Sequence, residues 1–198
     1  EKYYRPTIIL TQSNGHATGS ARTVAGFDIY SAIDACKDLL VNYGGHKFAA
    51  GLTMKVENVN EFQERFEKIV SSTITDDQLI PSILIDSEME LENISSKFYN
   101  VLKQFEPFGP ENMCPVFSTK NLEAVPKSAR IVGEKHLKFA LRKNGKSVFE
   151  AIAFQQADKL DLVNSGKFDA CYQISENEWN GRVTLQLEIK DMRIASIQ

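Results

Sequence analysis

The sequence has few of the residues from which metal centres and disulfide frameworks are built. Its 198 residues include three cysteines and three histidines, and no grouping of Asp with His has the spacing of metal ligands. A metal-dependent hydrolase needs such a grouping to hold its ions, so we expect neither a bound metal nor a catalytic residue in this chain. The cysteines lie far apart in apolar surroundings, which indicates reduced core thiols.

Long hydrophobic runs are also missing. No apolar run approaches the roughly 20 residues that a bilayer-spanning helix needs, and no basic-then-apolar leader opens the chain. The sequence therefore predicts a cytoplasmic protein without a membrane partner. Because it begins with Glu1 and a strand is predicted within a few residues, we expect it to be part of a longer protein.

The composition that remains is that of a globular protein, with 42% hydrophobic and 25% charged residues. The length allows one large domain or two small ones. Residues 71–78 lose hydrophobic periodicity and gain polar side chains, which is typical of a domain boundary. We therefore predict domains at 1–76 and 77–198.

Charge is distributed unevenly along the chain. The net charge of −3 argues against a protein that coats DNA indiscriminately. Within residues 120–146, however, eight basic residues outnumber two acidic ones. The basic residues are Lys120, Lys127, Arg130, Lys135, Lys138, Arg142, Lys143 and Lys146. An anionic partner is expected to contact this segment.

The first half is organised around residues 44–51, which include three glycines and two alanines. Apolar residues at helical spacing predict a helix that ends at Tyr43. Gly44 would then take a positive φ at the helix end, Gly45 would let the backbone approach a ligand, and His46 would offer a polar tip. The simpler alternative is a helix stop followed by a surface histidine.

Two strands are predicted before that helix. Residues 6–11 form a β-branched run that favours a buried strand, and residues 16–24 return as a second strand. Ser20 and Arg22 would point to the same face of it. A hydroxyl beside a planar guanidinium suits a phosphate, although the pair also fits a solvated edge. After the glycine segment, residues 52–56 predict another strand and Asn58 opens a helix as part of a capping box.

The second half predicts mostly strands. Residues 81–86 form the first, a helix extends to a rigid turn at residues 107–110, and strands follow at 116–132, 136–142, 147–154, 168–175 and 183–190. The strand at 116–132 is long enough to be bent or broken. A short helix lies around residues 157–162. Five strands with a helix between the third and fourth is the order of an OB-fold barrel. The fold class is thus α+β, with a small α/β domain followed by a five-stranded OB-fold β-barrel.

The barrel is expected to bind its anionic partner through the basic residues of its first three strands. These are Lys127, Arg130, Lys135, Lys138 and Arg142. If Asn144 and Gly145 form a two-residue turn, Phe149 lies outward beside the cations, where it could stack on a base. A β-bulge would instead return Phe149 to the core. Trp179 is expected to anchor a loop, with nucleotide stacking as its alternative.

Three motifs support a family resemblance. Gly-Gly-His-x-x-Ala-Ala-Gly at residues 44–51 resembles the signature of the DHH-associated domain, which grips nucleic acid in the DHH family of phosphoesterases. Gly-Ser-x-Arg at residues 19–22 and Pro-Phe-Gly-Pro-x-Asn-x-x-Pro-Val-Phe at residues 107–117 narrow the resemblance to the RecJ family of single-strand-specific DNA exonucleases. This sequence departs from the usual form of the latter segment at Glu111, Met113 and Cys114, which are connector positions.

The resemblance covers nearly the whole chain but only the C-terminal part of the family's architecture. It implies that DNA phosphates are bound by Ser20, Arg22, Gly44, Gly45 and His46. It also implies that Mn or Mg is held by a DHH domain absent from this chain. The chain would then grip single-stranded DNA for a 5′→3′ exonuclease of recombination and repair without cutting it, with that DHH domain and a single-strand-binding protein as further partners.

Two alternatives remain open. One is another DHH-type phosphodiesterase, such as an oligoribonuclease or a cyclic-dinucleotide phosphodiesterase, which carries the same glycine motif. The other is a non-catalytic module that binds nucleic acid or protein.

Overall fold

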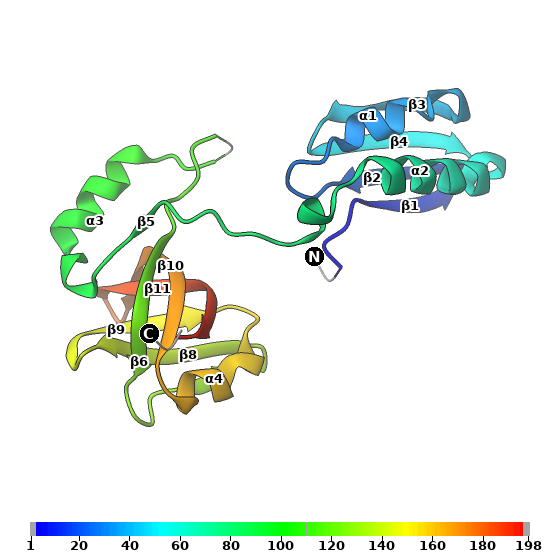
Figure 1. Cartoon of the computed structure of the whole chain (residues 1–198). Coiled ribbons are helices and arrows are strands. Elements are labelled where there is room, and N and C mark those ends of the chain that lie inside the picture. The colour runs from blue at the N-terminus through cyan, green and yellow to red at the C-terminus, as the bar shows by residue number, and fades with distance from the viewer. Residues whose placement is uncertain (1–2, 110, 196–198) are drawn as a thin grey trace. The chain divides into compact units, whose positions relative to one another are not determined.

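The computed structural model describes residues 3–109 and 111–195, and their contacts divide the chain into two units, Glu1–Ser82 and Ile83–Gln198 (Figure 1). The division lies six residues after the predicted boundary. Residues just beyond 76 stay with the first unit because Gln78 Nε2 donates to Gly26 O at 2.6 Å and Arg5 Nη1 donates to Leu79 O at 3.2 Å.

The first unit is a four-stranded antiparallel sheet with two helices. In chain order its strands and helices are β1 (Thr7–Ser13), β2 (His16–Arg22), α1 (Ile29–Asp34), β3 (Leu40–His46), β4 (Ala49–Lys55) and α2 (Val59–Thr73). Three 3₁₀ turns are described as well, at Lys37–Leu39, Val56–Asn58 and Asp76–Leu79. The sheet order is β1-β2-β4-β3. The prediction of an α/β unit is confirmed.

One face of this sheet forms the core. Alternate residues of β2 and β4 are buried against α1 and α2, as the period-two pattern of a strand requires. The buried set is Ala17, Ala21, Ala50, Leu52 and Met54 from the sheet, with Ile29, Ile33 and Phe62 from the helices. The residues between them on β2 and β4 point to the other face.

Two predicted features of this unit are wrong. The strand expected to be buried, β1, is a half-exposed edge in which 71% of Ile9 is accessible. The helix expected to reach Tyr43 ends at Asp34, and Leu40 and Tyr43 belong to β3. Both side chains still pack against the core, so the apolar spacing was read correctly as burial and wrongly as helix. Pairing of β3 with β4 decides the conformation.

Side-chain contacts fix both flanks of β3. Asn58 does not cap α2 as predicted, because its amide donates to Leu39 O at 2.9 Å. Arg65 donates to Asp38 at 2.6 Å, and this bond lowers the pKa of Asp38. Tyr43 donates to Asp34 at 2.5 Å, a bond that raises the pKa of Tyr43 to about 12. These contacts set the position from which the glycine segment starts.

The second unit is a barrel preceded by a short helix. In chain order its strands and helices are β5 (Ser87–Glu88), α3 (Ser96–Leu102), β6 (Phe117–Ala124), β7 (Arg130–Val132), β8 (His136–Lys143), β9 (Lys146–Ala153), α4 (Leu160–Ser165), β10 (Phe168–Trp179) and β11 (Arg182–Ile194). Three 3₁₀ turns are described as well, at Leu91–Asn93, Lys103–Phe105 and Ala157–Lys159. The sheet order is β5-β6-β10-β11-β9-β8-β7, and an extra β6–β8 pairing closes a ring of five strands. With α4 between the third and fourth, the predicted OB-fold is confirmed.

The strand predicted at residues 81–86 does not form. Pro81 has no backbone N–H to donate, and Ile83, Leu84 and Ile85 are exposed and outside any strand. Only Asp86 joins the barrel, because its N–H donates to Val116 O and its carboxylate accepts from Val116 N, each at 2.8 Å.

The turn predicted at residues 107–110 is held by Asn112. Its side-chain amide donates to Phe105 O at 2.8 Å and to Pro107 O at 3.0 Å. Gly109 and Asn112 also exchange backbone hydrogen bonds. Pro110 itself lies outside the described residues. Asn112 therefore explains why an amide side chain follows the Pro-Phe-Gly-Pro segment.

A buried hydroxyl pair gives a stability test of the barrel. Thr119 Oγ1 lies 2.6 Å from Met89 O and 2.7 Å from the hydroxyl of Tyr172. Because Met89 O only accepts, Thr119 donates to it and Tyr172 donates to Thr119. Burial also raises the pKa of Tyr172 to about 12.

Replacing Thr119 with Val leaves Met89 O and the Tyr172 hydroxyl without this partner, so the free energy of unfolding should fall by about 1–3 kcal/mol. Urea unfolding measures the change. The double variant Thr119→Val/Tyr172→Phe should recover part of the loss, because the orphaned hydroxyl is then gone. A double variant no more stable than Thr119→Val would contradict the assignment.

Candidate nucleic-acid interfaces

The second face of the first sheet brings the predicted phosphate-binding residues together. Ala49 is paired with Arg22 on one side and with His46 on the other, and Gly51 is paired with Ser20 and with Gly44. Residues directly opposite each other on neighbouring strands point to the same face. Ser20, Arg22 and His46 therefore lie on one face of the sheet, around the small residues Ala49 and Gly51 of β4.

The polar groups of this face are positioned to donate. Phe48 N–H donates to His46 Nδ1 at 3.3 Å, so the neutral ring carries its proton on Nε2. Arg22 uses Nη1 to donate to Ala21 O at 2.9 Å, and it forms no ion pair with any other described residue. An anion placed between these two side chains would meet N–H groups from both.

The four glycines of the sheet separate into two kinds. A Cβ on Gly19 would lie 2.4 Å from Ile9 O, and one on Gly45 would lie 2.4 Å from Ala49 O, so the neighbouring backbone requires both glycines. A Cβ on Gly44 would have nothing within 4 Å, and one on Gly51 would only meet Gly19 O at 3.9 Å. Internal packing therefore explains Gly19 and Gly45 but not Gly44 and Gly51.

The predicted roles of Gly44 and Gly45 at a helix exit are wrong. Both lie at the end of β3, next to the hairpin that leads into β4. Gly44 has no positive φ, whereas Gly45 does, at 146°. The close approach that Gly45 permits is to the backbone of Ala49 and Ala50. The open position that faces solvent belongs to Gly44.

This face carries no carboxylate among the described strand residues. Its members are Thr7, Ile9, Thr11 and Ser13 of β1, His16, Thr18, Ser20 and Arg22 of β2, Ala49, Gly51, Thr53 and Lys55 of β4, and Asn42, Gly44 and His46 of β3. The whole chain has 26 acidic and 23 basic residues. An acid-free face on a net acidic chain favours an anionic ligand.

On the barrel, a register shift changes which aromatic faces outward. The β8–β9 hairpin turns at Asn144 and Gly145, but its register shifts between Leu141 and Lys143. Phe149 is therefore paired with Leu141, not beside Ala140 as predicted, and packs against the core. The outward orientation of Phe149 is wrong, and the bulge alternative holds.

The barrel's basic segment is partly neutralised by acidic neighbours. Lys120 pairs with Glu88 at 2.7 Å, Arg142 with Glu123 at 3.0 Å and Lys143 with Glu90 at 2.6 Å. Glu88 and Glu90 come from outside residues 120–146, so the sequence window overstated the local charge. Arg142, a predicted DNA contact, is one of the paired residues.

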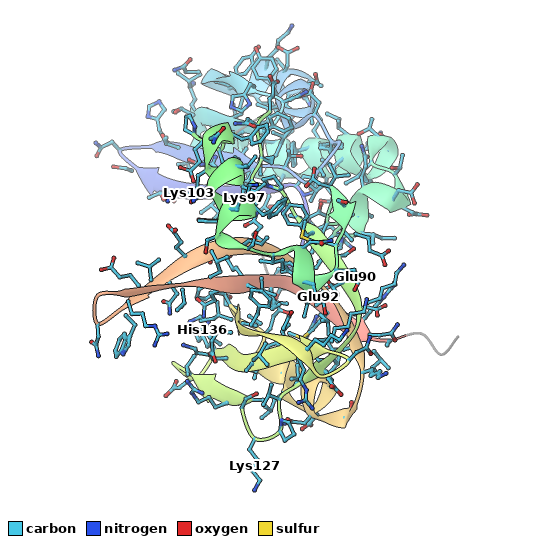
Figure 2. All side chains as sticks on the ribbon, turned by 90° about the vertical axis from the view of Figure 1, so that its left-hand side faces the viewer. Glu90, Glu92, Lys97, Lys103, Lys127 and His136 are labelled. Carbon is cyan, nitrogen blue, oxygen red and sulfur yellow. The ribbon has the colours of Figure 1, made fainter. Side chains whose placement is uncertain are left out.

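The four other cations predicted to contact DNA have no acidic partner among the described residues. Lys127 extends from its loop away from the barrel (Figure 2), and Lys135 lies in the turn before β8. Arg130 on β7 is directly opposite Lys138 on β8. None of the four forms an ion pair with another residue in the described ranges. Because like charges opposite each other repel, the Arg130–Lys138 pair favours an anion between them.

Sequence reasoning missed the aromatic pair beside these cations. Phe154, 49% exposed, packs edge-on against His136 with ring centroids 5.3 Å apart. Gln155 N–H donates to His136 Nδ1 at 3.0 Å, which fixes the ring. The clue was available in the alternation of β9. Shifting its register by one residue turns Phe149 inward and Phe154 outward.

Trp179 is not the predicted loop anchor. It lies at the end of β10 opposite Arg182, with 74% of its surface exposed. Beyond the last pairs with β6 and β9, residues 176–179 and 182–185 pair only with each other, so the end of this hairpin continues past the barrel.

The described residues contain no group of three or more His, Cys, Asp or Glu side chains placed to hold a metal ion. The residues present therefore do not fit the metal centre of a nuclease. Cys36, Cys114 and Cys171 are free thiols, and burial raises the pKa of each. Within the described ranges, no helix is long and apolar enough to cross a bilayer.

Comparison with known proteins matches both units. The family model of the RecJ OB domain matches residues 85–191, more than half of the chain, and that of the DHHA1 domain matches residues 1–72. The single-stranded-DNA-specific exonuclease RecJ of Bacillus subtilis is 32% identical over 203 residues, covering 100% of this chain and 25% of that protein.

Solved structures give the same result. RecJ of Thermus thermophilus in complex with Mn²⁺ superposes with a TM-score of 0.71 at 26% identity, and its complex with Mg²⁺ with a TM-score of 0.68 at 27% identity. Each match covers 96% of this chain, and 27% or 28% of the relative. The chain thus spans about a quarter to a third of the proteins that it matches. With both of its units matched in this order, the chain belongs to the RecJ family.

Proposed function

We propose that this chain holds single-stranded DNA for the nuclease centre of its parent protein. The observation that carries the proposal is a sheet face whose described strand residues include no acid, and on which Ser20, Arg22 and His46 surround Gly51, a glycine that packing does not require. The names of the RecJ relatives support single-stranded DNA as the anion.

On the sheet face, the ligand group is the 5′ phosphate of the DNA. Arg22 and His46 lie two strands apart, about 10 Å between backbones, and both side chains can reach a phosphate centred over Ala49. Arg22 supplies a planar pair of donors and Ser20 a hydroxyl. With no Cβ on Gly44 or Gly51, the sugar-phosphate backbone can approach the sheet directly.

The barrel holds the DNA further along the strand. Lys127, Arg130, Lys135 and Lys138 contact phosphates, and Phe154 offers a base the stacking surface first assigned to Phe149. Base stacking on an aromatic ring contributes roughly 1–3 kcal/mol per base and tolerates any sequence. Such a surface suits an enzyme that must accept every base.

We assign cleavage to groups outside this chain. Hydrolysis of a phosphodiester by Mn²⁺ or Mg²⁺ needs a cluster of ligands, and the described residues have none. The metal centre is therefore assigned to the DHH domain of the parent, which would be a cytoplasmic 5′→3′ exonuclease of recombination and repair.

Incubated with Mn²⁺ and single-stranded DNA, the chain alone should leave the DNA intact.

Protein partners are a second part of the proposal. The parent's DHH domain must meet the sheet face if the phosphate bound there is to reach the metal ions. A single-strand-binding protein is the other partner we propose, with the exposed Trp179 and Val183 of the long hairpin as an apolar contact. If the hairpin served only this role, mutating Trp179 would leave DNA binding by the chain unchanged.

Alanine should have opposite effects on stability at Gly45 and at Gly51. Gly45→Ala should lower the free energy of unfolding by more than 1 kcal/mol, because the positive φ and the contact with Ala49 both disfavour a side chain. Gly51→Ala should keep or raise stability, since Gly costs about 0.5–1 kcal/mol in a strand, yet weaken DNA binding. Urea unfolding and fluorescence anisotropy measure the two effects. Full binding by a stable Gly51→Ala variant would argue against direct approach of DNA.

The 5′-phosphate role of Arg22 has a matched substrate test. Arg22→Ala should weaken binding of 5′-phosphorylated oligonucleotides by about 10- to 150-fold, since a charge-assisted hydrogen bond contributes about 1.5–3 kcal/mol. Binding of the same oligonucleotide with a 5′ hydroxyl should change little. Equal losses for the two ends, measured by anisotropy, would make Arg22 a general backbone contact.

The ion pairs of the barrel predict unequal roles for its cations. Neutralising Lys138 should reduce the slope of log K against log salt by about 0.7, the value for one phosphate on a single strand. Arg142→Gln should reduce it less, because Arg142 already pairs with Glu123. Anisotropy titrations at several salt concentrations provide the slopes. Equal reductions would show that the Arg142–Glu123 pair opens to admit DNA.

A further inference from the structure

The polar face of the first sheet continues well beyond the three residues assigned to the 5′ phosphate. Thr18 and Thr53 are paired in the next row, with hydroxyl oxygens 3.2 Å apart. The row after that pairs His16 with Lys55. Both rows lie on the same face as Ser20 and Arg22, because the residues alternate along β2.

The far row can accept an anion. Lys55 is exposed, and its only described ion pair is a long one of 3.6 Å with Glu57, which is exposed as well. Such surface pairs contribute about 0–1 kcal/mol, so a phosphate can replace Glu57 at little cost. His16 Nδ1 donates to Asn14 O at 3.1 Å, which leaves Nε2 without a described contact. Nε2 donates to a phosphate oxygen when both ring nitrogens carry a proton.

The two cationic ends are separated by a distance that a short oligonucleotide spans. Arg22 and His16 are six residues apart on β2, or about 20 Å along the strand. Duplex DNA places one phosphate per 3.4 Å of axis on each strand, and an extended single strand places them further apart. A strand of about four to six nucleotides therefore reaches from one end to the other. The hydroxyls of Thr18 and Thr53 lie between.

We propose that His16 and Lys55 form a second phosphate-binding position, and that single-stranded DNA lies along β2 and β4 from the Arg22–His46 end to this one. The occupant is single-stranded DNA because every charged strand residue on the described face is a cation or a histidine. This inference rests on the proposed function and adds the direction in which the DNA leaves the 5′-phosphate site.

Ligands of two lengths distinguish the second phosphate-binding position from the 5′-phosphate position. Lys55→Ala should weaken binding of a 5′-phosphorylated dodecathymidylate by about three- to tenfold at low salt and reduce its salt slope by about 0.7. Binding of a 5′-phosphorylated dithymidylate should not change, because two nucleotides cannot reach Lys55. Lys55→Arg should keep the binding of the longer ligand. NMR titration suits the dinucleotide and anisotropy the dodecamer.

Lys68 provides the charge control. It is exposed on α2, which packs on the opposite face of the sheet, so Lys68→Ala removes the same charge without touching the proposed path. An equal loss of dodecamer binding in Lys68→Ala and Lys55→Ala would overturn the inference. So would unchanged dodecamer binding in Lys55→Ala when Arg22→Ala still weakens it, although the proposed function would then stand. If neither Lys55→Ala nor Arg22→Ala weakens binding of the dodecamer, both the proposed function and this inference fail.

Discussion

The alternation of side chains along β2 and β4 is the constraint on which the first unit depends. A strand has two faces, and here one of them is committed to the helices by Ala17, Ala21, Leu52 and Met54. The residues between them have no partner in the core, and they are small or polar, with positive charge at the two ends. The same pattern that builds the core thus sorts Ser20, Arg22 and Lys55 onto one surface.

The glycine motif combines two requirements that are often treated as one. Gly45 lies where the hairpin brings β4 too close for a side chain, so it serves the fold. Gly44 and Gly51 lie over open space, so a side chain there would only obstruct something that arrives from outside. A motif of this kind can be divided by asking, at each glycine, what a Cβ would touch.

Much of this organisation could be predicted from the sequence, and the failures have physical causes. The α/β unit, the barrel, its strand order and the Asn144-Gly145 turn all follow from local patterns. Leu40 and Tyr43 fit a helix and a strand equally well, and only pairing with β4, which lies later in the chain, decides between them. Residues 81–86 have strand composition but no neighbouring strand to pair with.

The barrel surface shows the same limit at the level of single side chains. A one-residue bulge near Arg142 exchanges Phe149 for Phe154 on the outer face. The alternation of β9 fits this register, but only pairing with β8 selects it. The partners of Lys120 and Lys143 come from residues 88 and 90, outside the basic window, so the charge of the window overestimated the charge of the surface. The composition of the sequence located the basic region. Strand pairing and ion pairs determine which of its side chains face outward without an acidic partner.

DNA is proposed to lie on the face of the first sheet opposite α1 and α2. Titration of the isotopically labelled chain with a 5′-phosphorylated oligothymidylate, followed through backbone amide chemical shifts, measures where the DNA binds. DNA on that face should give the largest shifts in this unit at Ser20, Gly44 and Gly51, with little change along α2. Shifts concentrated on α2, or confined to the barrel, would contradict it.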